Sequence, residues 1–296
     1  MAAITAIDWT DATPNPITHR CTKIAPECAN CYAETITNRW EGRGAFTSGP
    51  PRLKPHKLAD PWRDKGMREA YRKFLASMSD PFHIRLSFDD QALLFAMMAA
   101  DRASVYQVPT KRAAIMCRRL SSPDFERRAR EHLGTLEQMA RDARRITPWR
   151  QAMLEDIAAA RAGWTWPLPN VWIGVSAGTR DTARRYIPWL VRAPAATRFL
   201  SCEPLLEELS LEQWLSASGQ PPGTGLIHWV IAGGESGSGH RPLDLDHARA
   251  LRDQCQSHSV PFWFKQVGGL THNAGGDELD GRRWKQLPVP REGVLV

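Results

Sequence analysis

The sequence predicts an α/β protein, a complete or partial (β/α) barrel in which strands and helices alternate. Short runs rich in β-branched and aromatic residues recur along the chain with little polar alternation, which is typical of strands buried on both faces of a parallel sheet. Helical stretches lie between these runs, for example at 181–191 and 244–257, and this alternation indicates a barrel. A doubly wound open sheet is the alternative fold. The five clearest runs are 105–108, 171–175, 198–202, 228–232 and 261–265.

The length of 296 residues suits one large domain, because a single (β/α) barrel commonly uses about 250 residues or more. Two weaker candidate strands, at 7–10 and 74–77, precede the five clear runs. An arginine-rich, mainly helical insertion at about 112–166 is then expected after the third strand. Residues from about 268 to 296, rich in Gly, Asp and Arg, are expected to form a closing C-terminal loop. The predicted organisation is one barrel domain over residues 1–296.

Composition excludes several classes of protein. Hydrophobic residues make up 42% of the chain and charged residues 24%, values that argue against a disordered or collagen-like protein. No apolar run approaches the roughly 18 residues of a membrane-spanning helix, so no membrane partner is expected. The first residues lack the pattern of a secretory signal, which favours the cytoplasm. Six cysteines are too few for a disulfide scaffold in a chain of this length.

The charge balance points weakly to nucleic acid as a partner. A formal net charge of +7 draws a protein towards polyanions, because binding releases counterions from them. Two interpretations of the arginine-rich insertion stay open. It is either a solvated helical hairpin, with Glu126 facing Arg130 and Glu137 facing Arg141, or a surface that contacts nucleic acid. Most of the twelve tryptophans are expected in the core, although a few could stack unpaired bases.

Polar side chains follow nearly every predicted strand. In barrels of this kind the chemistry lies where strands end and loops begin, so these side chains are expected to share one rim and one polar site. The residues concerned include Ser79, Asp80, Lys111, Ser176, Glu203, Gly233, Gly234, Glu235 and Lys265.

The strongest local signal is a CX6CX2C arrangement formed by Cys21, Cys28 and Cys31. Three thiolates so close together would repel one another, and coordination of a metal is the natural way to stabilise them. A zinc site is one possibility, with His19 as the fourth ligand. A [4Fe–4S] cluster held by three cysteines is the other, and it leaves one iron open to a further ligand. We favour the cluster, because no second CX2C pair completes a common zinc-binding arrangement.

Seven segments in order along the chain resemble those of a phage-associated family with a three-cysteine motif, which is regarded as radical S-adenosylmethionine-like. The resemblance spans most of the chain apart from the arginine-rich insertion. The segments are WTDATPNPITHRCTKIAPECANCYAE, SMSDPFH, TKR, PNVWIGVS, RFLSCEPLL, WVIAGGESG and PFWFKQVGG.

This resemblance implies a barrel of the radical S-adenosylmethionine type, with a [4Fe–4S] cluster on Cys21, Cys28 and Cys31. The open iron would chelate S-adenosylmethionine, and an electron donor would supply the electron for its reductive cleavage. Gly233, Gly234 and Glu235 resemble the element with which that superfamily binds the methionine amino group, although here they end a late strand. The superfamily spacing is usually CX3CX2C, so this chain carries three extra residues in the first gap.

The sequence therefore predicts an enzyme that reductively cleaves S-adenosylmethionine to act on a nucleic acid or a nucleotide-derived substrate. Two alternatives remain: a zinc-containing nucleic-acid-binding protein without turnover, and a barrel lyase with Lys111 or Lys265 as a Schiff base. In the leading interpretation, Lys111, Glu203 and Lys265 are catalytic. The expected cofactor-binding residues are Tyr32, Ser79, Asp80, Ser176, Gly233, Gly234 and Glu235.

Overall fold

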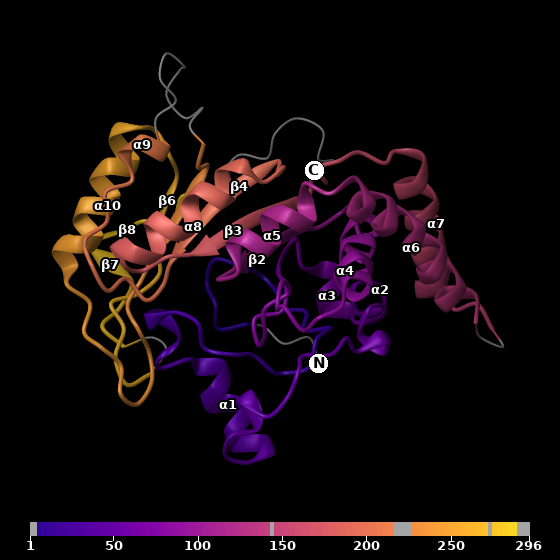
Figure 1. Ribbon diagram of the computed structural model, residues 1–296, viewed down its shortest axis with the longest axis horizontal. Helices are drawn as coiled ribbons and strands as arrows, with labels where there is room; N and C mark the ends of the chain where they lie inside the picture. The colour runs from indigo at the N-terminus through magenta and orange to yellow at the C-terminus, as the bar shows by residue number, and fades with distance from the viewer. Residues whose placement is uncertain (1–4, 143–144, 216–225, 272–273, 289–296) are drawn as a thin grey trace.

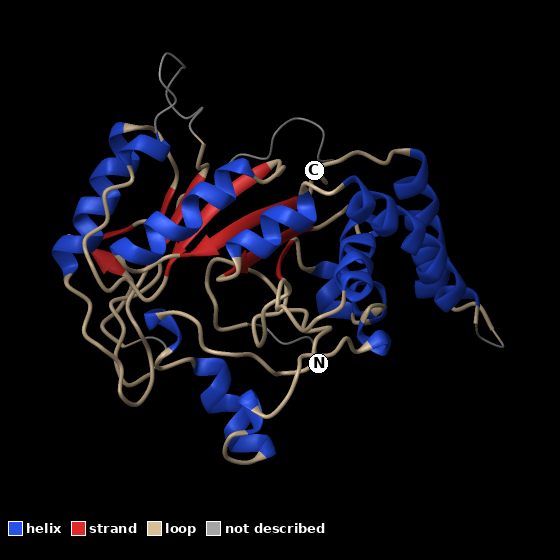
Figure 2. Cartoon of the chain, in the orientation of Figure 1, coloured by secondary structure: helices blue, strands red, loops and turns tan. Residues whose placement is uncertain are grey.

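The structure, a computed structural model, describes residues 5–142, 145–215, 226–271 and 274–288, and it shows a curled parallel sheet with the form of a half-barrel (Figures 1 and 2). The six strands are hydrogen-bonded in chain order, and every neighbouring pair is parallel. All their carboxyl ends therefore lie at one edge. The strands are β1 (Arg72–Phe74), β2 (Val105–Thr110), β3 (Val171–Ser176), β4 (Thr197–Cys202), β5 (Trp229–Ala232) and β6 (Phe262–Phe264).

Helices connect successive strands, as expected for a partial (β/α) barrel. Helices α5 and α8 cross one face of the sheet, and α4, α6 and α7 gather at one end of it (Figure 1). In the part of the chain that the structure describes, no helix is long and apolar enough to cross a membrane. The α-helices are α1 (Tyr32–Glu41), α2 (Asp60–Arg63), α3 (Lys65–Glu69), α4 (Phe88–Ala100), α5 (Ala113–Leu120), α6 (Pro123–Arg141), α7 (Pro148–Ala162), α8 (Arg180–Arg192), α9 (Glu212–Leu215) and α10 (Leu245–Ser257). Three 3-10 turns lie at Pro26–Cys28, Ala45–Thr47 and Pro55–Lys57.

The two faces of the sheet bury different side chains. Successive strand residues point to opposite faces, so Ile173 and Leu200 join the large core beneath the helices while Trp172 and Phe199 point the other way. A cluster of large aromatic residues fills that second face, with Trp229 packed edge-on against Trp172 and Trp263. Four of the twelve tryptophans of the chain lie in this cluster. The strand runs lack polar alternation because both faces are buried.

The five clear strand predictions are confirmed, with boundaries that differ by one or two residues. Helix α8 begins at a capping box in which the Thr179 side chain accepts from the Thr182 amide at 3.2 Å, and the Thr182 hydroxyl accepts from the Thr179 amide at 3.1 Å. The predicted helix at 244–257 is also present, and the side chain of Asp244 caps its first turn. Strong hydrophobic runs and helix-capping residues therefore predicted these strands and helices correctly.

The predictions for the first part of the chain are partly wrong. Residues 7–10 form no strand. This segment pairs with β1 through a single bridge, between Ala12 and Lys73. Pro14 and Pro16 have no N–H with which to extend that pairing into a strand. The candidate at 74–77 overlaps β1 only at Phe74, because Ala76 has a φ of 60° that no strand residue adopts. The three-cysteine loop therefore precedes the first strand, and the insertion follows the second.

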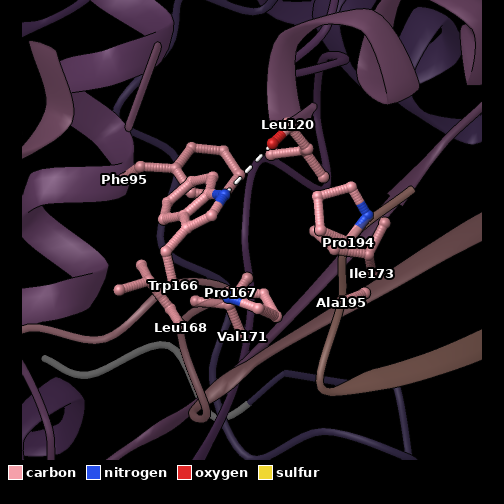
Figure 3. A pocket seen from close by; sticks show the side chains of 9 residues that line it. All are labelled: Phe95, Leu120, Trp166, Pro167, Leu168, Val171, Ile173, Pro194 and Ala195. Atoms are coloured by element: carbon pink, nitrogen blue, oxygen red, sulfur yellow. Dashed lines mark hydrogen bonds between the residues drawn. The ribbon is translucent and has the colours of Figure 1, made fainter. Parts of the chain in front are cut away.

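The insertion consists of α5, α6 and α7 within its described residues, while residues 143–144 lie outside them. Arg141 pairs with Glu137 at 3.0 Å, as the helical spacing predicted. Glu126 instead accepts a hydrogen bond from Trp164 at 3.2 Å. A small apolar pocket lies where the end of the insertion meets the sheet, and Trp166 reaches across it to the Leu120 carbonyl at 3.1 Å (Figure 3).

The C-terminal segment contains regular structure and pairs with β6, the last strand of the sheet. Strands β7 (Glu278–Leu279) and β8 (Arg282–Arg283) form a short antiparallel hairpin. The following residues run along β6, where the Phe264 amide donates to the Trp284 carbonyl at 2.8 Å. Pairing of this kind covers an edge that would otherwise expose unpaired backbone groups. Residues 272–273 and 289–296 of the predicted closing loop lie outside the described residues.

Candidate metal and cofactor site

The loop from Cys21 to Cys31 lies at the carboxyl edge of the sheet, where side chains from four strand ends hold it. Arg112, just after β2, makes the first attachment. Its Nη2 donates to the Thr22 carbonyl at 3.1 Å and to the Thr22 hydroxyl at 2.9 Å, and it lies 3.6 Å from Cys21 Sγ. Asp80 fixes the other end of this guanidinium, with Oδ2 2.8 Å from Arg112 Nη1. Both side chains are over nine-tenths buried, so this charge pair is shielded from solvent.

The end of β1 adds further contacts to the same loop. Asp80 Oδ1 accepts from the Thr110 hydroxyl at 2.7 Å, which ties the ends of β1 and β2 together. The Ser79 hydroxyl donates to the carbonyl of Arg20 at 2.7 Å, directly before the first cysteine. At the other end of the loop, the Tyr32 hydroxyl donates to the Ser77 carbonyl at 2.5 Å. Ser79, Asp80 and Tyr32 thus hold the loop in place.

Glu27, which lies inside the loop, attaches it to the start of α8. Its Oε1 accepts from the Gly178 amide at 2.7 Å and from the Thr182 hydroxyl at 2.5 Å. The side chain is buried, and Oε2 has no hydrogen-bond partner among the described residues. A carboxylate is well placed at a helix N-terminus, where the free amides and the helix dipole favour negative charge. Gly178 must be glycine here, because a Cβ would lie 1.9 Å from the Pro204 carbonyl oxygen.

The end of β5 provides the fourth attachment, through Glu235. Its Oε2 accepts from the side-chain amide of Asn30 at 2.8 Å, and its Oε1 lies 2.7 Å from Arg241 Nη2. Arg241 also donates to the Pro26 carbonyl at 3.1 Å. Burial by itself raises the pKa of Glu235, but the hydrogen bonds from Arg241 and Asn30 hold that pKa below its ordinary value. Both oxygens of this carboxylate are therefore already engaged with the protein.

A separate ion pair joins the ends of β4 and β6. Lys265 Nζ lies 2.9 Å from Glu203 Oε1, and the Ser201 hydroxyl donates to the other oxygen of Glu203 at 3.3 Å. The side chains of Lys265 and Glu203 keep 22% and 12% of their surface exposed, although Oε1 of Glu203 is itself buried. Gly233 lies beside the pair, since a Cβ there would be 3.5 Å from Glu203 Oε1. The neighbouring Gly234 has a packing role, because its Cβ would lie 1.8 Å from the Val267 carbonyl oxygen.

Most of the residues predicted from strand ends therefore meet at one edge. Asp80 joins Cys21 through Arg112, Glu203 pairs with Lys265, and Glu235 contacts the loop through Asn30. Lys111 is near enough to Cys31 to influence its charge, while Ser176 ends β3 in register with Ser201. Glu27 and Arg241 were missed. A lone glutamate within a cysteine motif gives no sign that it will be buried, and Arg241 lies in an irregular loop with no periodic pattern.

The surroundings of the Cys21 and Cys31 thiols change their pKa values from those of solvent-exposed thiols. Burial, followed by the nearby Asp80 carboxylate, raises the pKa of Cys21 to about 11, although Arg112 acts in the opposite direction. Burial also raises the pKa of Cys31, which the Lys111 ammonium partly offsets. A metal would displace these thiol protons, because cysteine binds metals as thiolate. The remaining cysteines, Cys117, Cys202 and Cys255, are buried, as expected for small hydrophobic side chains.

The three cysteines suit a thiophilic metal or cluster by residue type. Cys21 and Cys31 pack against the same small cluster formed by Ala33, Phe46 and Met78. Over the described ranges, no three His, Cys, Asp or Glu side chains are gathered closely enough to hold a metal ion. The thiols would therefore have to draw together on binding. The donors fit the group, and the anchored loop limits how far they must move.

The comparisons with known proteins identify a family. A family model described as a protein of unknown function, DUF5131, matches residues 4–288. The chain belongs to this family. The DUF5131 match covers the cysteine loop, all six strands of the sheet and the insertion. No curated protein and no solved structure matches the chain.

Proposed function

We propose that this protein is a radical S-adenosylmethionine-type iron–sulfur enzyme that acts on a nucleic acid or a nucleotide-derived substrate. One observation carries the proposal: the three-cysteine loop is attached to the ends of four parallel strands at the edge where barrel active sites lie. The attachments run through Ser79, Arg112, Gly178 and Glu235. A loop with no function at that edge would not need four separate anchors, two of which are buried charged side chains.

In this proposal Cys21, Cys28 and Cys31 hold a [4Fe–4S] cluster, and the iron without a cysteine ligand takes S-adenosylmethionine. When bound, the pair supplies a one-electron reduction that cleaves the sulfonium of the cofactor. The chain's own residues position the loop and keep water from it. An external electron donor and a cytoplasmic location complete the proposal, since all six cysteines are free, as in proteins of a reducing compartment.

Arg112 and Lys111 are proposed to stabilise the bound thiolates. The Arg112 guanidinium is held by Asp80 and donates towards Cys21 Sγ, and an N–H donor to a cysteine sulfur shifts negative charge away from the metal. Lys111 adds positive charge near Cys31. These two cations would partly offset the burial and the Asp80 carboxylate, which raise the pKa of the Cys21 thiol and oppose the thiolate form that a cluster needs.

Glu203 is proposed to contact a polar group of the bound cofactor, and Lys265 a polar group of the substrate. They offer one anion and one cation on neighbouring strand ends, with surface still exposed to a ligand. Glu235 takes a different role from the one expected from sequence. Because Arg241 and Asn30 already use its carboxylate, we propose that Glu235 positions the cysteine loop rather than binding the methionine ammonium directly.

The experiment is to reconstitute the protein anaerobically with iron and sulfide, add S-adenosylmethionine, reduce with dithionite and measure 5′-deoxyadenosine. Wild type should bind the cofactor and release 5′-deoxyadenosine, and a Cys28→Ala variant should release none. Lys265→Ala should still bind the cofactor, because that residue is assigned to the substrate side. If cluster-loaded wild type neither binds nor cleaves S-adenosylmethionine, the radical mechanism is rejected.

A further inference from the structure

Helix α1 carries an exposed aromatic and aliphatic stripe directly beside the cysteine loop. Tyr32, Ile36 and Trp40 follow one another at four-residue spacing, which places them on one face of the helix. Their exposed fractions are 42%, 43% and 81%, and Trp40 has the largest value among the large hydrophobic residues that the structure describes. The helix lies apart from the helical layers that cover the sheet (Figure 1). Most tryptophans of this chain lie in packed clusters, whereas Trp40 offers its ring to solvent.

Arginines accompany this stripe without carboxylate partners. Arg39 precedes Trp40, and Arg43 follows the end of α1. Both are exposed, and neither forms an ion pair with another described residue. The acidic residues of α1 are already used, because Glu34 pairs with Lys23 at 2.6 Å and Glu41 with Arg20 at 2.7 Å. The surface beside Trp40 is therefore positively charged.

The arginines of the insertion present a contrast. Arg127 and Arg128 share Glu131, and Arg128 also pairs with Asp89 at 2.6 Å. Arg141 and Arg161 both pair with Glu137. A guanidinium already held by a carboxylate gains less from a phosphate, since the existing pair must first be broken. These four arginines therefore fit the interpretation of the insertion as a solvated helical hairpin, although the exposed Arg118 and Arg130 form no ion pair with another described residue.

We propose that α1 and the loop after it form a binding surface for single-stranded nucleic acid. Trp40 stacks a base, and Arg39 and Arg43 contact phosphates. A flat exposed indole between unpaired cations suits an unstacked base, because every base has a π face and the backbone is anionic. A duplex keeps its bases stacked and offers no ring to Trp40. This proposal locates the binding site of the nucleic acid on the protein surface. It rests on the proposed function only for the class of substrate.

The position of α1 connects this surface to the candidate site. The helix begins at the residue after Cys31, and Tyr32 fastens its first turn to the end of β1. A strand bound along α1 therefore lies next to the cysteine loop. Tyr32 is both an anchor of the loop and the first member of the exposed stripe.

The test is the fluorescence anisotropy of a labelled oligothymidine and of a labelled duplex of equal length, titrated with full-length protein at several salt concentrations. Trp40→Ala should weaken binding of the single strand by roughly 5- to 150-fold, the range found for loss of one stacked base. The double variant Arg39→Ala/Arg43→Ala should lower the magnitude of the logarithmic salt slope by about 1.4, or about 0.7 for each phosphate contact. The matched control is Arg127→Ala/Arg128→Ala, which should leave the slope unchanged. Trp40→Phe should retain part of the affinity because it keeps a ring.

Three results would overturn this proposal. Trp40→Ala could bind the single strand like wild type while remaining folded by circular dichroism, the control variant could lose as much affinity, or the duplex could bind more tightly than the single strand. The first would leave the stripe as a contact for another protein, and the second would move the nucleic acid to α6. The proposed function fails separately. Wild type that binds oligothymidine through Trp40 but takes up no iron would keep this surface and reject the iron–sulfur enzyme.

Discussion

Replacing Glu27 by alanine should destabilise the protein and loosen the cysteine loop. The change removes the acceptor of two buried hydrogen bonds, from the Gly178 amide at 2.7 Å and the Thr182 hydroxyl at 2.5 Å. A buried donor left without a partner costs about 1–3 kcal/mol. The Gly178 amide is such a donor, whereas the Thr182 hydroxyl can turn to the Thr179 carbonyl 3.1 Å away. The predicted loss in the free energy of unfolding is therefore about 1–3 kcal/mol.

Glutamine at the same position is the matched control. It keeps one oxygen in the place of Oε1 and can still accept from Gly178 and Thr182. It also removes a buried negative charge whose second oxygen has no hydrogen-bond partner among the described residues. Removing the unpaired buried charge is favourable, and it offsets the weaker hydrogen bonds that a neutral amide oxygen accepts. Glu27→Gln should therefore lie within about 1 kcal/mol of wild type.

Urea unfolding of the metal-free protein, followed by far-UV circular dichroism, measures both changes. The two variants should also differ when they are titrated with Co²⁺, whose thiolate complexes absorb in the near ultraviolet. The alanine variant should bind Co²⁺ more weakly, since its loop has lost the anchor to α8. A change below about 0.5 kcal/mol for Glu27→Ala, the size typical of neutral surface substitutions, would refute the reasoning that Glu27 holds the loop.

Other expectations follow from the same contacts. Glu235→Gln should weaken cluster retention more than cofactor affinity, measured as iron lost to a chelator over time, because the variant breaks the link from Arg241 to Asn30; equal retention with reduced cofactor affinity would restore Glu235 as the ammonium ligand. Burial, followed by the nearby Arg112, lowers the pKa of His83 to about 4. The unfolded chain protonates His83 near pH 6.5, whereas the folded state does so only near pH 4. The free energy of unfolding should therefore fall as the pH drops from about 6.5 to about 4. His83→Gln should flatten this part of the pH profile, and an unchanged slope would contradict the assignment.

The sequence was most informative where packing follows a simple pattern. The run at 171–175 could be read as a buried parallel strand because nearly every residue in it is apolar, and all six residues of β3 are buried. Residues 7–10 misled because Ile7 and Trp9 alternate with polar residues, as in a short strand. Whether it joins a ladder depends on neighbours such as Pro14 and Pro16, which cannot donate.

The candidate site could be predicted in outline but not in its contacts. Parallel strands bring their ends to one edge whatever the loops do, so Asp80, Glu203 and Lys265 could be assigned to one rim. Which side chains pair there depends on distances that no spacing rule contains. Glu235 illustrates this limit, since its resemblance to a ligand-binding element gave no indication that Arg241, six residues later, occupies its carboxylate.

Analysis of iron, sulfide and zinc in anaerobically reconstituted protein tests the central claim most directly. Wild type should contain iron and sulfide in the equal amounts of a [4Fe–4S] cluster, with little zinc. Alanine at Cys21, Cys28 or Cys31 should each abolish iron uptake, whereas Cys117→Ser should retain it. Stoichiometric zinc without iron, or full iron content in the three alanine variants, would contradict the account.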